Sequence, residues 1–253
     1  MKITILGCGT STGVPMVGCT CRVCSSDDPR DKRTRASILI SHMERNILVD
    51  TSTDLRRQSL RQEITKIDAV LFTHAHADHV NGIDDLRGFY FQHREIIPCY
   101  ASGSTLTTLH TGFRYIFQEH KNSGYSPLLT SHEINDPFEL FGLNIIPIPL
   151  IHGKTTAIGY RIGSFAYLTD CSEIPDSSME LLTGLDLLII DGLRWTEHPF
   201  HFNIEAAIAA SQQLNPRRTI LTHLSHDVAY ADRTKLPPGV EFAYDGMMFD
   251  LNP

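Results

Sequence analysis

The sequence lacks any apolar run that approaches the length of a transmembrane helix, so we expect no membrane span. The run at Met1–Gly7 is short and ends at a glycine, which predicts a first strand and not a secretion signal. A surplus of basic residues is also missing, because the formal net charge is −7 at pH 7. This balance argues against a broad cationic surface for nucleic acid and leaves only a local basic groove open.

Long linkers, low-complexity segments and internal repeats are absent as well. Of the 253 residues, 42% are hydrophobic, which is enough for a substantial core and argues against disorder. The length alone allows one large domain or two small ones. Because no linker is visible, we predict a single domain over residues 1–253.

Six cysteines are present, and three of them crowd into a C-x-C-x-x-C motif at Cys19, Cys21 and Cys24. Without a secretion signal, these side chains are expected as thiolates in a reducing compartment, and the cytoplasm is the default location. The other cysteines lie in or beside apolar segments and are interpreted as small core residues, namely Cys8, Cys99 and Cys171.

Short β-rich segments alternate with helical patterns along the chain, which predicts a layered α/β architecture. The predicted strands are Lys2–Leu6, Ala36–Ile40, Asn46–Val49, Ala69–Phe72, Ile97–Tyr100, Leu143–Pro149, Ala157–Ile162, Phe165–Leu168, Leu187–Ile190 and Thr219–Leu221. The predicted helices are Ser52–Gln62, Ile83–Tyr90, Ser104–Ile116, Asp176–Leu182 and Ile204–Leu214, the last of which Asn203 can cap.

A dense group of metal-ligand side chains follows the apolar strand Ala69–Phe72. His74, His76, Asp78 and His79 place four candidate ligands within six residues, at H-x-H-x-D-H spacing. Histidine nitrogen and carboxylate oxygen suit zinc, and also manganese or iron. The spacing therefore predicts a metal site at the end of this strand.

The H-x-H-x-D-H motif resembles the signature of the metallo-β-lactamase superfamily. The resemblance implies a four-layer αβ/βα sandwich with two catalytic divalent metals at one edge. It also implies three later ligands, and His152, Asp170 and His223 each follow a predicted strand. The implied assignment gives the first metal to His74, His76 and His152 and the second to Asp78, His79 and His223, with Asp170 bridging. Asp50 would orient a ligand histidine, or else cap the helix Ser52–Gln62.

Three further motifs resemble the PhnP group of this superfamily, which are phosphoribosyl cyclic phosphate phosphodiesterases. They are Gly7–Pro15 with Gly18–Cys24, Leu221–His226 and Leu236–Met247. In that group a histidine beyond the last catalytic ligand completes a structural zinc site with three cysteines. Here the implied ligands are Cys19, Cys21, Cys24 and His226, and three thiolates plus one imidazole form a closed tetrahedral shell.

The predicted catalytic residues are Asp78, as a ligand, and His201. In related phosphodiesterases a histidine from the His201 region reaches the scissile phosphate, and a neutral-pH acid suits leaving-group protonation. His198 is the competing candidate. Arg35 or Arg114 could hold a further phosphate, and the Gly7–Gly13 loop either gives a phosphate access to backbone amides or forms a tight turn.

The resemblance leads to the hypothesis of a phosphodiesterase that hydrolyses a small cyclic or nucleotide-like substrate through water activated between two metals, Zn or Mn. An RNA-processing nuclease related to transfer-RNA 3′-processing enzymes is less favoured, because no basic insertion is visible. A carboxylic ester, thioester or lactone hydrolase, a metal-stapled binding protein and a homodimeric state also stay open.

Overall fold

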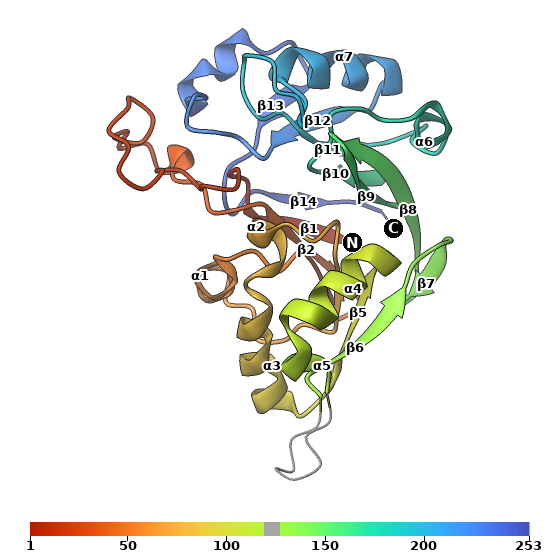
Figure 1. Cartoon of the computed structure of the whole chain (residues 1–253). Coiled ribbons are helices and arrows are strands. Elements are labelled where there is room, and N and C mark those ends of the chain that lie inside the picture. Colours follow the sequence, from red (N-terminus) through yellow and green to blue (C-terminus); the bar gives the residue numbers. More distant parts are fainter. Residues whose placement is uncertain (119–126, 253) are drawn as a thin grey trace.

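Two seven-stranded sheets face each other in the computed structural model, which describes residues 1–118 and 127–252 (Figure 1). The first sheet has the order β14-β1-β2-β3-β4-β5-β6, with β1 (Lys2–Gly7), β2 (Ser37–His42), β3 (Arg45–Val49), β4 (Ala69–Leu71), β5 (Ile97–Ala101), β6 (Leu129–Glu133) and β14 (Met248–Asp250). The second has the order β13-β12-β11-β10-β9-β8-β7, with β7 (Phe138–Leu140), β8 (Leu143–His152), β9 (Thr155–Ile162), β10 (Phe165–Leu168), β11 (Leu187–Asp191), β12 (Arg218–Thr222) and β13 (Val240–Phe242).

Helices cover the outer face of each sheet. They are α1 (Leu55–Arg61), α2 (Ala77–Val80), α3 (Leu86–His93), α4 (Gly103–Gly112), α5 (Arg114–Phe117), α6 (Asp176–Glu180) and α7 (Ile204–Leu214), with 3₁₀ turns η1 (Pro29–Asp31), η2 (Ile83–Asp85) and η3 (Tyr230–Lys235). Leu55, Leu86 and Leu109 bury α1, α3 and α4 against the first sheet. Ile204 and Ala207 bury α7 against the second. Apolar side chains of both sheets fill the space between them, so the predicted four-layer αβ/βα sandwich is confirmed.

Helix α7 has the predicted bounds, and the Asn203 side chain caps it by accepting a hydrogen bond from the Ala206 N–H. The helix predicted over 104–116 was wrong as a single element, because Phe113 leaves the helical region at φ −125° and separates α4 from α5. The helix predicted from Ser52 begins only at Leu55. The Ser52 hydroxyl instead accepts from the Asp54 N–H and donates to Gln58.

Strand β8 is longer than the predicted Leu143–Pro149 and reaches His152, which pairs with Thr155 across a tight turn into β9. Its pairing with β7 ends at Ile145. Pro147 and Pro149 therefore lie where β8 pairs only with β9 among the described strands, and a proline is tolerated there because one side of the strand needs no donor. The strands β6, β7, β13 and β14 were not predicted.

The glycine at the end of β1 permits close packing of three segments. A Cβ atom at Gly7 would lie 2.1 Å from the Arg35 carbonyl oxygen and 2.4 Å from Gln58 Nε2. Further along the loop, the Gly13 N–H donates to the Thr10 carbonyl at 2.8 Å, so the Gly7–Gly13 loop contains a tight turn. In the part of the chain that the structure describes, no helix has the length and apolarity needed to cross a bilayer.

Candidate metal centre

The candidate ligands gather where strands of the two sheets end at one edge of the sandwich. His74, His76, Asp78 and His79 follow β4, and His152 is the last residue of β8. Asp170 follows β10 and His223 follows β12. Because β10, β11 and β12 are mutually parallel, their carboxyl ends deliver these side chains to the same edge. The tertiary structure therefore brings all seven predicted catalytic ligands together.

Asp170 lies between two groups of histidines, with one oxygen toward each. Its Oδ2 is 3.6 Å from His74 Nε2 and 3.8 Å from His152 Nε2. Its Oδ1 is 3.2 Å from His79 Nε2 and 3.3 Å from His223 Nε2. A carboxylate in this position can contribute one oxygen to each of two neighbouring cations.

Two four-residue clusters result, and each has its ligand atoms within 4.8 Å of one another. They are His74, His76, His152 and Asp170, and Asp78, His79, Asp170 and His223. Within them, Asp78 Oδ2 lies 3.2 Å from His79 Nε2, and His152 Nε2 lies 3.3 Å from His76 Nδ1. The donor types and their number suit a pair of divalent metals.

Buried nitrogens without partners provide an independent test of whether a metal fits. Among the described residues, the Nε2 atoms of His74, His79 and His223 are buried and make no hydrogen bond. A buried polar atom left unpaired costs about 1–3 kcal/mol, and three at one point are uncommon in a stable fold. Metal ligation would satisfy all three, so the residues present fit the metals that the fold implies.

The electrostatics of the cluster keep its carboxylates ionised, as metal ligands must be, and hold a proton on a histidine where a metal would bind. Burial opposes charge on Asp170 and Asp78, but the facing histidines outweigh burial and hold both pKa values far below the usual range. Burial and the neighbouring histidines lower the pKa of His74. Burial disfavours the charged form of His223 too, yet Asp170 and Asp78 raise its pKa to about 9. A metal would thus replace a proton at His223.

Hydrogen bonds from outside the cluster fix two of its histidines. The Asp50 carboxylate lies 2.7 Å from His79 Nδ1 and also accepts bonds from the Thr73 N–H and hydroxyl. The His152 Nδ1 nitrogen donates to the Phe200 carbonyl at 2.8 Å. Both contacts leave Nε2 facing the cluster, as orienting partners of ligand histidines do. Asp50 thus orients a histidine, whereas helix α1 begins at Leu55 and does not use Asp50 as its cap.

His201 is held against the cluster by a carboxylate that sequence reasoning missed. Asp191 is fully buried at the end of β11, and its Oδ2 lies 2.7 Å from His201 Nδ1. The His201 ring stacks on that of His223, with centroids 4.8 Å apart. A signal was available, because Asp191 directly follows the apolar segment Leu187–Ile190 just as Asp50 ends its strand.

His198, the competing candidate, has a different environment. Its Nδ1 atom accepts from the Phe200 N–H at 3.3 Å, and its ring is 5.1 Å from that of His201. No carboxylate in the described part of the chain lies within ion-pair distance of it. Of the two histidines, only His201 thus has a carboxylate that fixes its ring and supports a proton on Nδ1.

The cysteine motif meets His226, which lies more than 200 residues away in the sequence. Cys19 Sγ and Cys21 Sγ each lie 3.4 Å from His226 Nδ1, and Cys24 completes a cluster within 4.8 Å. The Cys24 N–H and His226 lower the pKa of the Cys21 thiol to about 6, while burial raises that of Cys24 to about 11. Three cysteines and one histidine at these distances match the donor set of a closed zinc site.

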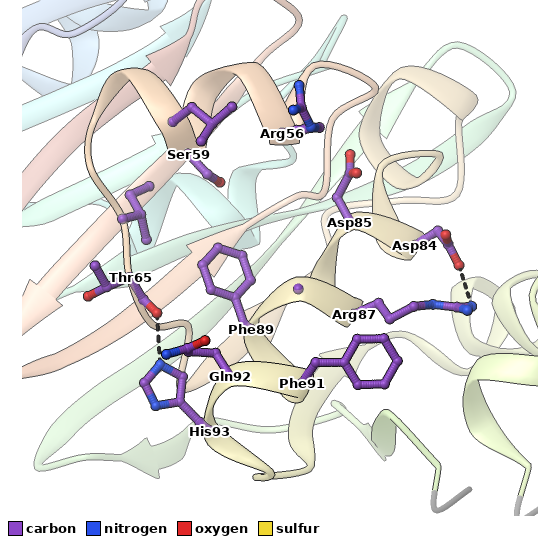
Figure 2. A pocket seen from close by; sticks show the side chains of 13 residues that line it. Arg56, Ser59, Thr65, Asp84, Asp85, Arg87, Phe89, Phe91, Gln92 and His93 are labelled. Carbon is purple, nitrogen blue, oxygen red and sulfur yellow. Dashed lines mark hydrogen bonds and ion pairs between the residues drawn. The ribbon is translucent and has the colours of Figure 1, made fainter.

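The remaining candidates lie outside this cluster. Arg35 pairs with Asp54 at 3.1 Å and lines a small cavity of about 180 Å³ beside the Gly7–Gly13 loop. Arg114 is exposed at the start of α5. A larger cavity of about 570 Å³ lies between α1 and α3, with Phe89 and Phe91 among its lining residues (Figure 2). None of the candidate metal ligands lines that cavity, so it is separate from the metal centre.

Comparisons with known proteins identify the family. Residues 45–224 match the model of the beta-lactamase superfamily domain. A crystal structure of a diphosphatase from the PhnP family is 42% identical, with a TM-score of 0.93, and the match covers 99% of this chain and 98% of that one. Zinc-bound PqqB from Methylobacterium extorquens has a TM-score of 0.82 at 21% identity, covers 99% of this chain and 100% of that one, and shows the shared fold alone.

An octanoyltransferase of Porphyromonas gingivalis is also 42% identical, over 253 residues. The match covers 98% of this chain but 51% of that protein, so the chain spans about half the length of this relative. Its name therefore does not identify the activity of the matched half. The superfamily model and the PhnP-family structure both cover most of the chain, which therefore belongs to the metallo-β-lactamase superfamily and, within it, to the PhnP family.

Proposed function

We propose that this hydrolase cleaves a small phosphodiester at the metal centre, with His201 protonating the departing oxygen. The observation that carries the proposal is the pair of the buried Asp191 with the partly buried His201 beside the ligand cluster. His201 is not needed as a ligand, and its ring lies 4.8 Å from the rings of both His152 and His223. A phosphodiester with an alkoxide leaving group needs a proton at that oxygen, and a held histidine supplies it near neutral pH.

In this proposal, His74, His76 and His152 hold one divalent cation, Asp78, His79 and His223 hold a second, and Asp170 contributes an oxygen to each. When bound, such a pair lowers the pKa of water and stabilises charge on phosphoryl oxygens. Asp170 also keeps two dications screened from each other. The Cys19, Cys21, Cys24 and His226 cluster holds a third, structural zinc.

The role of Asp191 follows from the chemistry of imidazole. The His201 Nδ1–H donates to Asp191 Oδ2, which leaves Nε2 free to carry the proton that is transferred. Asp191 is a positioning residue, because it acts through His201. Its carboxylate also accepts the Cys171 N–H at 3.0 Å, so its orientation is fixed by the backbone after β10.

A second candidate function is hydrolysis of a diphosphate, favoured by the 42% identical diphosphatase of the PhnP family. The reacting centre would be the same, because both reactions break a P–O bond and release a leaving group through its oxygen atom. The human short-form tRNase Z is 17% identical, with a TM-score of 0.74, and the likeness indicates fold alone. With a net charge of −7, RNA is the less favoured substrate.

The test compares leaving groups in the metal-loaded enzyme. His201→Ala should lower kcat/KM for an alkyl-leaving phosphodiester by about 10²- to 10⁴-fold, the usual contribution of general acid catalysis. It should barely affect a nitrophenyl phosphodiester, whose leaving group departs without a proton. Asp191→Asn should show the same pattern more weakly. His198→Ala is the matched control and should leave both rates close to wild type.

Equal slowing of both substrates by His201→Ala would exclude the acid role and indicate phosphate positioning instead. The same assay includes a diphosphate, a thioester and a lactone. Faster turnover of the thioester or lactone than of any phosphorus substrate would reject the substrate class. Preference for the diphosphate would select the second candidate. Metal content should equal that of wild type in each variant.

A further inference from the structure

A phenylalanine ring lies exposed at the rim of the metal centre. Phe200 immediately precedes His201 and is 44% exposed. Its ring centroid is 6.4 Å from that of the candidate ligand His152 and 5.7 Å from that of His198. The proposed mechanism makes no use of this side chain.

Three contacts hold the Phe200 segment in place. Its carbonyl accepts the His152 Nδ1–H at 2.8 Å, and its N–H donates to His198 Nδ1 at 3.3 Å. The ring edge packs over Gly153, where a Cβ atom would lie 1.9 Å from Phe200 Cδ1. Gly153 also has a φ of +61°, which favours glycine. The turn after β8 thus accommodates this ring only because residue 153 has no side chain.

Single exposed apolar residues are common on protein surfaces and need no ligand. Phe200 differs in what it is attached to. Its carbonyl accepts a hydrogen bond from the candidate ligand His152, and the next residue, His201, is the proposed acid. Its ring packs against Gly153, which has no side chain. Phe200 is also 44% exposed, so it is not fully covered by the protein.

We propose that Phe200 stacks against a planar aromatic group of the substrate, such as a nucleobase, while the reacting phosphorus lies at the metal centre. This rests on the proposed function and narrows it to phosphodiesters that carry such a group. Stacking of a base on an aromatic side chain is tolerant of base identity, so we expect little discrimination among bases. The contact is made by the ground state, so it should act on KM more than on kcat.

The experiment uses two substrates with the same five-membered cyclic phosphodiester. Adenosine 2′,3′-cyclic phosphate carries a base, and glycerol 1,2-cyclic phosphate does not. Phe200→Leu keeps an apolar contact with Gly153 but has no aromatic face. It should raise KM for the adenosine substrate by about 5- to 100-fold, the range for loss of one stacked base. KM for the glycerol substrate and both kcat values should stay close to wild type.

Phe200→Trp should restore the low KM for the adenosine substrate. The matched control is Phe91→Leu, because Phe91 is similarly exposed at 41% but lines the cavity between α1 and α3 (Figure 2). An equal rise in KM for both substrates in Phe200→Leu would overturn the proposal. It would indicate that Phe200 only holds His152 in position. No change on either substrate would overturn it as well.

Failure of the proposed function is separable from failure of this inference. If the wild-type enzyme cleaves neither cyclic phosphate, calorimetric titration of the metal-loaded protein with AMP and with glycerol phosphate still tests the ring. AMP should bind more tightly to wild type, and Phe200→Leu should remove that difference. Equal affinities of the two ligands for wild type would exclude stacking. Thermal melting and metal analysis show that each variant is folded and loaded.

Discussion

At the scale of single residues, the metal centre depends on three side chains whose backbone is in the left-handed region. Asp50, Asp170 and His223 have φ values of 64°, 55° and 57°. Asp50 and His223 directly follow β3 and β12, and Asp170 lies two residues after β10. For residues other than glycine this conformation costs of order 1–3 kcal/mol, and it persists only where the surroundings enforce it. At these positions Asp170 and His223 belong to the ligand clusters, and Asp50 contacts His79.

Substitution of Asp170 should lower activity and metal occupancy more than substitution of any other single residue discussed above. Asp170→Ala removes the oxygens that face both histidine groups. We expect kcat/KM to fall by at least about 100-fold, because loss of an outer-shell partner alone typically costs 10- to 100-fold. Elemental analysis should show reduced metal occupancy. Asp176→Ala, an exposed carboxylate at the start of α6, is the control. Full metal content with wild-type turnover in Asp170→Ala would reject the bridging role.

At the scale of elements, the segment between β1 and β2, residues 8–36, contacts the loop after β12. Cys19, Cys21 and Cys24 meet His226 there, three residues beyond His223. Arg33 strengthens the same junction, since its buried guanidinium donates to the Ser225 carbonyl and pairs with Asp31 at 3.1 Å. Residues 8–36 have only a small apolar core, so these polar contacts and the proposed zinc site would hold the segment in place.

Removal of one thiolate should release the proposed structural zinc and leave the metals of the proposed catalytic cluster bound. Cys21→Ser is expected to lower Tm and to reduce metal content by one equivalent per chain. Ser25→Ala, an exposed position in the same segment, should change neither quantity. The readouts are thermal melting and elemental analysis of protein purified without added metal. Unchanged metal content in Cys21→Ser would contradict the assignment.

At the scale of the whole molecule, the two sheets are joined by hydrogen bonds next to the metal loop. The fully buried Tyr160 on β9 donates its hydroxyl to the Phe72 carbonyl at 2.6 Å. Two residues earlier, the Ile158 N–H donates to the Thr73 carbonyl at 2.9 Å. These bonds cross from the second sheet to the segment that begins the H-x-H-x-D-H motif, so packing of the sandwich also positions the ligands.

Tyr160→Phe should therefore destabilise the molecule, because it leaves a buried carbonyl without this donor. We expect the free energy of unfolding to fall by about 1–3 kcal/mol. Tyr167→Phe is a matched control on the adjacent strand, since its hydroxyl is buried without a hydrogen-bond partner among the described residues. That change should be neutral or stabilising. Guanidinium unfolding of both variants measures the difference, and equal destabilisation would refute the role of the Tyr160 bond.

The sequence by itself determined the elements whose signal is local. Four ligands within six residues after an apolar strand predict a metal site wherever the strand lies. The later aspartate and histidines came only from the resemblance to the superfamily, which implies such ligands after the following strands. Helix α7 was predicted to the residue because its cap and its apolar spacing are contiguous. The short strands β6, β7, β13 and β14 were not predicted, because their hydrophobic patterns are too short to recognise in the sequence. Their hydrogen bonds to a neighbouring strand are what define them.

Only the tertiary structure decided which side chains act on one another. Asp50 and His79 are 29 positions apart, and Asp191 ends β11 while His201 lies 10 positions later in the loop before α7. The sequence places Asp191 after an apolar strand, as it does other aspartates, and only the packing of the sheet shows that this carboxylate lies beside an imidazole. The same holds for Phe200, because its ring packs against a glycine that follows a different strand. Hydrogen bonds and ring contacts act over a few ångströms in space, so their partners are set by how the strands pack.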